Sequence, residues 1–112
     1  MAKPLQTQII ERARALIEDH ERWCRHYLAL DQDGVVVFPT NERTVKRCAL
    51  GALIAAAFEL TRDHDTADRL AYQALSLDCA TLTLTGTNDM KGHAAVLGLL
   101  DERIATKEQV VA

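Results

Sequence analysis

Eleven consecutive residues near the middle of the chain, CALGALIAAAF from Cys48 to Phe58, carry no charged or strongly polar side chain. A membrane-spanning helix needs about 20 apolar residues, so this run is too short to cross a bilayer. A helix that is apolar on all sides belongs in the interior of a fold. The run therefore predicts a central helix, which we place at residues 41–61 with Thr40 or Asn41 as its cap.

A helical wheel divides this segment into a bulky and a small surface. The bulky surface is an ordinary core face, formed by Leu50, Leu53, Ile54, Ala57, Phe58 and Leu60. The small surface carries Cys48, Gly51, Ala52, Ala55 and Ala56, and is continued by Glu59 and Arg62. Gly51 inside a helix costs about 1 kcal/mol relative to Ala, which suggests that another backbone or a ligand packs there. We expect a second helix to fill the small surface; a pocket beside Glu59 and Arg62, or a homodimer contact, is the alternative.

The rest of the chain also has mainly helical periodicity. Apolar residues recur at helical spacing after Pro4, after Asp19, after Asp63 and after Asn88 or Asp89. Two short segments, VVVF at 35–38 and ATLTLT at 80–85, are instead typical of strands and are candidates for a small two-stranded ribbon. We therefore expect a mainly α, orthogonal helical bundle that forms one domain over residues 1–112, with helix 41–61 at its centre.

Composition and charge narrow the functional classes. The 112 residues have the size of one domain, and 13 basic against 16 acidic residues give a formal net charge of −3. This balance does not favour nucleic acid as a partner, because proteins that bind nucleic acid usually carry a basic excess or a basic patch. The N-terminal segment has no continuous apolar stretch, so we expect neither a signal peptide nor a membrane anchor. We expect a cytoplasmic protein whose three cysteines are reduced.

A thiol site is the most specific catalytic hypothesis. A cysteine nucleophile needs a base, and the base needs an orienting partner. A small Cys/His-dependent hydrolase or transferase would use Cys48 as nucleophile, His93 as base and Asn88 or Asp89 as orienter. However, Cys48 falls inside the predicted helix rather than at its N-terminus, where the dipole would lower its pKa. The simpler interpretation is that Cys48 is a small core residue and that Asn88 and Asp89 cap a helix.

The potential metal ligands and the aromatic residues suggest less specific roles. The sequence has no Cys-x-x-Cys and no His-Glu-x-x-His motif, so we expect no metal site and no cofactor. Trp23 lies on one face of an expected short helix together with Tyr27. Core packing is the simpler role for Trp23, and an exposed Trp23 would instead anchor an interface.

Four motifs taken together, RWC, RCALGALIAAA, ND and HAAVLGLLDERI, resemble a family of small bacterial and phage-associated proteins classed as a domain of unknown function. The resemblance draws attention to Trp23, Cys48, Asn88, Asp89 and His93, but it implies no activity. Our leading hypothesis is a non-enzymatic binding or protein-interaction module of the bacterial cytosol, encoded on a mobile element. Its partner would be a second copy of the chain or an unidentified protein, and the thiol enzyme is the alternative.

Overall fold

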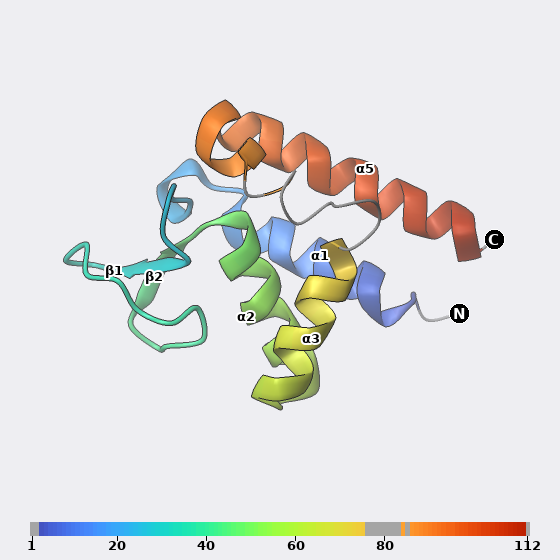
Figure 1. Cartoon of the computed structure of the whole chain (residues 1–112), viewed down its shortest axis with the longest axis horizontal. Helices are drawn as coiled ribbons and strands as arrows, with labels where there is room; N and C mark the ends of the chain where they lie inside the picture. The colour runs from blue at the N-terminus through green and yellow to red at the C-terminus, as the bar shows by residue number, and fades with distance from the viewer. Residues whose placement is uncertain (1–2, 76–83, 85, 112) are drawn as a thin grey trace.

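The computed structural model describes residues 3–75, 84 and 86–111, and these form a mainly helical fold with a small antiparallel sheet (Figure 1). The described elements are α1 (Leu5–Ile17), the 3₁₀ turn η1 (His20–Arg22), β1 (Ala29–Asp31), β2 (Thr44–Arg47), α2 (Ala49–Thr61), α3 (His64–Leu75), the π-helical turn η2 (Thr87–Lys91) and α5 (His93–Val111). The expected mainly α bundle is confirmed. None of the described helices is long and apolar enough to cross a membrane.

Helix α1 lies between the α2–α3 pair and α5, and it contacts all three helices (Figure 1). The predicted amphipathic pattern is present, because Ile9, Ile10, Ala13 and Ile17 are buried on one side of this helix. Arg12 and Arg14 on its other side form ion pairs with Glu59 and Glu18. The centre of the fold is therefore shared by α1 and α2 rather than held by one helix.

Helix α2 is the predicted apolar central helix, and every residue from 49 to 57 is buried. It begins at Ala49 and not at residue 41, so the predicted helix is eight residues too long at its N-terminus. Asn41 accepts a hydrogen bond from the Arg43 backbone N–H (2.8 Å) and forms a turn instead of a cap. Residues 44–47 then pair as β2, because strand hydrogen bonds to β1 replace those that a helix would make.

A small two-stranded sheet is present as expected, but within the described residues it is formed by β1 and β2 and not by the proposed segments. The sheet pairs β1 with β2 in an antiparallel register, Leu30 opposite Lys46. Residues 35–37 lie on the other side of β1, where Asp31 N–H donates to the Val35 carbonyl (2.9 Å) and Val37 N–H to the Ala29 carbonyl (3.1 Å). Most of the other proposed strand, residues 80–83 and 85, lies outside the described residues.

The small surface of α2 is covered by two different parts of the chain. A Cβ added to Gly51 would lie 2.9 Å from the carbonyl carbon of Leu28 and closer still to its oxygen. The expectation of a close backbone is confirmed, but the backbone belongs to a loop and not to a helix. Farther along, Glu59 reaches Arg12 of α1 (2.7 Å). Ala52, Ala55 and Ala56 are buried, so this surface is closed to a second copy of the chain.

Candidate functional site

Asn88 lies at the centre of the most extensive buried polar cluster among the described residues. Its Oδ1 accepts hydrogen bonds from the Trp23 Nε1–H (2.7 Å) and from the Ala49 backbone N–H (3.0 Å). Its Nδ2 donates to the Cys24 carbonyl (3.2 Å) and to Asp89 Oδ1 (3.0 Å). All the bonds that a side-chain amide can readily make are therefore made inside the protein. The side chain joins η2 to the Trp23 segment and to the start of α2.

The prediction that Asn88 or Asp89 caps the last helix is wrong. Both residues lie in the π-helical turn η2, and α5 begins only at His93. π-Helical turns rotate side chains away from the ordinary helical register. Here the turn directs Asn88, which is 1% exposed, into the cluster described above.

An aromatic group covers one side of this cluster. The ring centroids of Trp23 and His93 are 5.4 Å apart, and His20 lies 5.6 Å from Trp23 and 5.2 Å from His93. The Arg25 guanidinium lies 5.3 Å from the Trp23 ring centroid. Trp23 is 7% exposed, so packing accounts for nearly all of its surface.

His93 is engaged with the end of α1. Its Nε2 lies 2.6 Å from the Ile17 carbonyl oxygen. A carbonyl only accepts, so Nε2 carries the proton and is not available as a base. His93 also does not line the cleft that contains Cys48.

Asp89 holds a strained loop in place. Its Oδ1 accepts the His26 backbone N–H (2.9 Å), and His26 has a positive φ of 70°. A residue other than glycine in this region needs compensating contacts. The His26 backbone bond, followed by the Asn88 amide, lowers the pKa of Asp89. The expected helix through Tyr27 is thus a bent loop.

Cys48 borders a small cleft of about 110 Å³ beside this loop. The other residues around the cleft are His26, Tyr27, Leu28, Leu50, Asn88 and Asp89. Cys48 is the N-cap of α2, and its Sγ accepts the Gly51 backbone N–H (3.3 Å). The prediction that Cys48 lies well inside the helix is therefore wrong. Burial nevertheless raises the pKa of the Cys48 thiol, outweighing the Gly51 bond that lowers it.

Cys24 is a second buried thiol near this cleft. Burial, together with charge repulsion from Cys48, raises the pKa of Cys24 to about 11. Its Sγ lies 3.4 Å from the Tyr27 carbonyl oxygen. Both thiols are therefore kept protonated at neutral pH, which is unfavourable for nucleophilic attack.

The predicted site residues divide into two groups. The structure brings Trp23, Asn88 and Asp89 together, with Cys48 at the cleft and His93 behind Trp23. Glu59 and Arg62 lie elsewhere: Glu59 pairs with Arg12, and Arg62 caps the C-terminus of α2 in a left-handed conformation. Within the described ranges no three His, Cys, Asp or Glu side chains are grouped closely enough to hold a metal ion.

The sequence pattern indicated neither His26, which lines the cleft, nor Cys24, the second buried thiol. Cys24 is adjacent to Trp23 in the RWC motif, and this position is the sequence signal that could have added Cys24 to the candidate residues. No sequence signal marked His26, because its place depends on a positive φ and on a carboxylate 63 residues away.

A Trp–Cys segment, a Cys–Ala–Leu–Gly helix start and an Asn–Asp turn thus meet around one buried amide. A family model described as a family of unknown function, DUF6197, matches residues 1–112. The chain belongs to DUF6197. This match confirms the resemblance to a domain of unknown function, and the DUF6197 description assigns no activity. Comparison with curated proteins and with solved structures gives no match for this DUF6197 chain.

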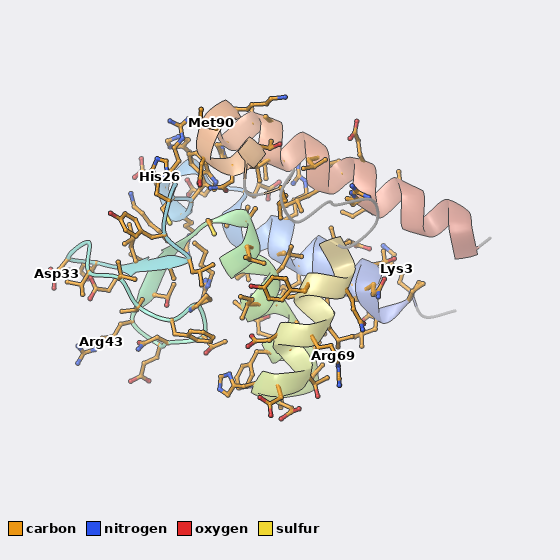
Figure 2. The ribbon with its side chains drawn as sticks, in the orientation of Figure 1. Lys3, His26, Asp33, Arg43, Arg69 and Met90 are labelled. Carbon is orange, nitrogen blue, oxygen red and sulfur yellow. The ribbon has the colours of Figure 1, made fainter. Side chains whose placement is uncertain are left out.

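A second candidate site in this DUF6197 chain is an apolar surface at the sheet. Residues 35–38, which we call the valine edge, expose Val35 (57%), Val36 (56%) and Phe38 (47%). Val45 on β2 and Tyr27 are also exposed. Figure 2 shows Asp33 and Arg43 projecting from the loops at this end of the molecule, away from the helices.

Proposed function

We propose that the protein is a non-enzymatic protein-interaction domain of the cytosol, and that the valine edge, residues 35–38, is its binding surface. The observation that carries the proposal is the exposure of Val35, Val36 and Phe38 on a short segment that is joined to the outer side of β1 by the Leu30–Val36 bridge. An exposed strand edge with apolar side chains is a ready template for pairing with another chain.

The backbone of the valine edge supports the same role. Leu30 and Val36 are paired without direct hydrogen bonds, since the bonds to β1 are made by Val35 and Val37. Alternate residues of a strand point their N–H and C=O groups to opposite sides. The Val36 groups therefore point away from β1, and they have no backbone partner within the described residues. An extended segment of another chain could pair with them.

The usual protection against such pairing is weak here. Natural edge strands are commonly guarded by lysines, inward-pointing charges or prolines. The segment from Gly34 to Phe38 has no charged residue, and Pro39 limits it at one end only. This combination favours a short binding edge over an accidental exposure.

A photo-crosslinking experiment tests the proposal. A photoreactive benzoyl-phenylalanine replaces Phe38, and in a matched variant it replaces Tyr72 of α3, which has the same exposed fraction of 47%. In cells of the encoding organism we expect protein adducts from position 38 and none, or far fewer, from position 72. Equal yields at the two positions, or no adduct at position 38, would contradict the proposal.

The cleft favours one second candidate, a thiol enzyme. It gathers a thiol, an imidazole and a carboxylate, and His26 Nδ1 lies 3.7 Å from Asp89 Oδ2. In this candidate His26, rather than His93, would take the proton of Cys48 while Asp89 orients the imidazole. The raised pKa of Cys48 argues for the interaction domain instead. The rate at which iodoacetamide alkylates Cys48 in the folded chain separates the two candidates.

A further inference from the structure

We infer that Cys24 and Cys48 form a redox-active dithiol, which a low-molecular-weight disulfide such as oxidised glutathione converts to an intramolecular disulfide. This modification site is separate from the valine edge and does not depend on the proposed function. The two cysteines are 24 positions apart in the chain, and both are buried free thiols. In cytosolic proteins, disulfides of this kind are usually transient and act in catalysis or redox sensing.

The backbone places the two cysteines opposite each other. Trp23 and Arg47 form a parallel bridge, and the Cys24 N–H donates to the Arg47 carbonyl (3.1 Å). Cys24 and Cys48 are the next residues on the two segments, so they follow the bridge in the same register. Neighbouring extended segments lie about 4.7–4.9 Å apart. Because the Cα atoms of a disulfide usually lie about 4.4–6.8 Å apart, the spacing set by the bridge suits a disulfide.

The side chains of the two cysteines point to the same side of this pair of segments. Successive side chains of an extended segment alternate between two faces, and bridge partners share a face. Trp23 (φ −113°, ψ 145°) and Cys48 (φ −79°, ψ 177°) are both extended, so the alternation holds here. Trp23 and Arg47 therefore share one face, and Cys24 and Cys48 share the other.

Asn88 holds the two cysteine segments together. Its Nδ2 donates to the Cys24 carbonyl (3.2 Å), and its Oδ1 accepts the N–H of Ala49, the residue after Cys48 (3.0 Å). One buried amide thus binds both segments at once. The segments separate only if these buried hydrogen bonds break, so the two thiols have a high effective concentration toward each other.

The surroundings of the sulfur atoms agree with this proximity. The Cys24 Sγ lies 3.4 Å from the Tyr27 carbonyl oxygen, and the Cys48 N–H donates to the next carbonyl, that of Leu28 (3.2 Å). Both cysteines therefore contact the same two residues of the loop before β1. A thiolate at Cys48 is also near enough to repel one at Cys24, which contributes to the raised pKa of Cys24.

The order of the chemical steps follows from access to the thiols. Cys48 borders the cleft of about 110 Å³, so its thiolate attacks the small disulfide first. The S–S bond of the reagent breaks, a mixed disulfide forms at Cys48, and one small thiolate leaves and takes up a proton. The Cys24 thiolate then attacks the Cys48 sulfur, and the second small thiolate leaves in the same way. The protein loses two electrons and two protons, and the reagent gains both.

Equilibration of the full chain with a glutathione buffer tests the inference. A Cys79→Ser chain keeps only these two thiols, and it is equilibrated at about pH 8.5, either folded or unfolded in urea, until its composition is constant. In the folded chain we expect a mass lower by two hydrogens. The equilibrium constant for disulfide formation should be at least about tenfold higher than in the unfolded chain, where a flexible loop joins the thiols. By linkage, the oxidised chain should also unfold at a higher urea concentration than the reduced chain.

Peptide mapping identifies the bond. Trypsin cleaves after arginine, so a bond between Cys24 and Cys48 joins peptide 23–25 to peptide 48–62. A Cys24→Ser variant of the same chain is the matched control, and it should show neither the joined peptides nor the loss of two hydrogens. If the Cys79→Ser chain does not fold, as measured by circular dichroism, the same map of the wild-type chain distinguishes this bond from one to Cys79.

Three results overturn the inference. The first is a folded chain that ends as a mixed disulfide with glutathione. The second is an equilibrium constant less than about tenfold above that of the unfolded chain. The third is a wild-type chain in which Cys79 is bonded and peptides 23–25 and 48–62 are not joined. None of these results bears on the crosslinking expected at the valine edge, so the two proposals fail separately.

Discussion

At the scale of single residues, Asn88 is the side chain on which most of the buried polar contacts depend. It satisfies the Trp23 indole and the first backbone N–H of α2 at the same time. Removing one partner from a buried hydrogen bond leaves the other unsatisfied, at a cost of about 1–3 kcal/mol for each group. We therefore expect Asn88→Ala to lower the free energy of unfolding by about 3 kcal/mol or more, measured by urea denaturation.

Asn41→Ala is the matched control for this substitution. Asn41 is exposed and holds only the turn before β2 through one bond to Arg43. Its loss should cost less than about 1 kcal/mol. If the two variants are equally stable, Asn88 does not hold the cluster together.

The two buried thiols lead to a prediction about reactivity and pH. Because burial raises the pKa of Cys24 to about 11 and also raises that of Cys48, few thiolates are present at neutral pH. In a Cys79→Ser background, iodoacetamide should modify both at least about 100-fold more slowly in the folded than in the urea-unfolded chain. Mass spectrometry of peptides measures the two rates.

The raised pKa values of Cys24 and Cys48 also determine how the stability of the protein changes with pH. As pH rises above neutral, the unfolded thiols lose their protons first, so the unfolded state binds fewer protons and stability falls. For Cys24 this loss extends to about pH 11.

A Cys48 that reacts rapidly at neutral pH, and slows in His26→Ala, would support the thiol enzyme and count against the interaction domain.

At the scale of elements, the contact between α2 and the loop before β1 decides how the helix is packed. Gly51 has the Leu28 backbone directly against its Cα, so a methyl group requires the loop or the helix to move. We expect Gly51→Ala to destabilise the protein by about 2 kcal/mol or more, although alanine favours helices. Thermal or urea unfolding followed by circular dichroism gives the difference.

Gly98→Ala provides the opposite case in the same molecule. Gly98 lies within α5, and among the described residues a Cβ there would meet no atom within 4 Å beyond the backbone of its own helix. This substitution should stabilise the protein by about 0.5–1 kcal/mol. Equal effects at Gly51 and Gly98 would show that helix propensity, and not the Leu28 backbone, governs position 51.

At the scale of the whole molecule, long-range contacts close the fold. The Trp23–Asn88 bond joins residues that are 65 positions apart, and His93 reaches Ile17 over 76 positions. Trp23 is the only tryptophan, so its fluorescence reports the closure of the η2–α5 segment onto the N-terminal half. We expect its emission and the helical circular dichroism to change at the same urea concentration, as in a two-state transition.

A separate transition of the fluorescence at lower urea would contradict this expectation. It would show that η2 and α5 leave Trp23 while α1 and α2 remain packed. Trp23→Phe keeps a ring beside His93 but removes the hydrogen-bond donor to Asn88. This variant should unfold at a lower urea concentration than the wild type. Its far- and near-ultraviolet circular dichroism should still change at the same urea concentration.

The sequence by itself determined the elements whose signal is local. The uncharged run from Cys48 to Phe58 specified a buried helix, and the apolar spacing of α1 specified which side faces the core. Both features follow from the spacing of apolar residues over a few helical turns, because this spacing decides which surface of a helix can be buried. Gly51 indicated that a backbone or a ligand packs against the small surface of α2, and the structure places the Leu28 loop there instead of the expected second helix.

Only the tertiary structure decided which segments meet. Two segments have short strand-like or ambiguous patterns, Val35–Phe38 and Thr44–Arg47. Both pair with β1, which no sequence pattern indicated as a strand. Asn88 suited a helix cap equally well by local criteria, but three of its four bonds reach chain segments 39 or more residues away. Such contacts are selected by the need to satisfy buried polar groups across the whole fold, and this need has no local signature.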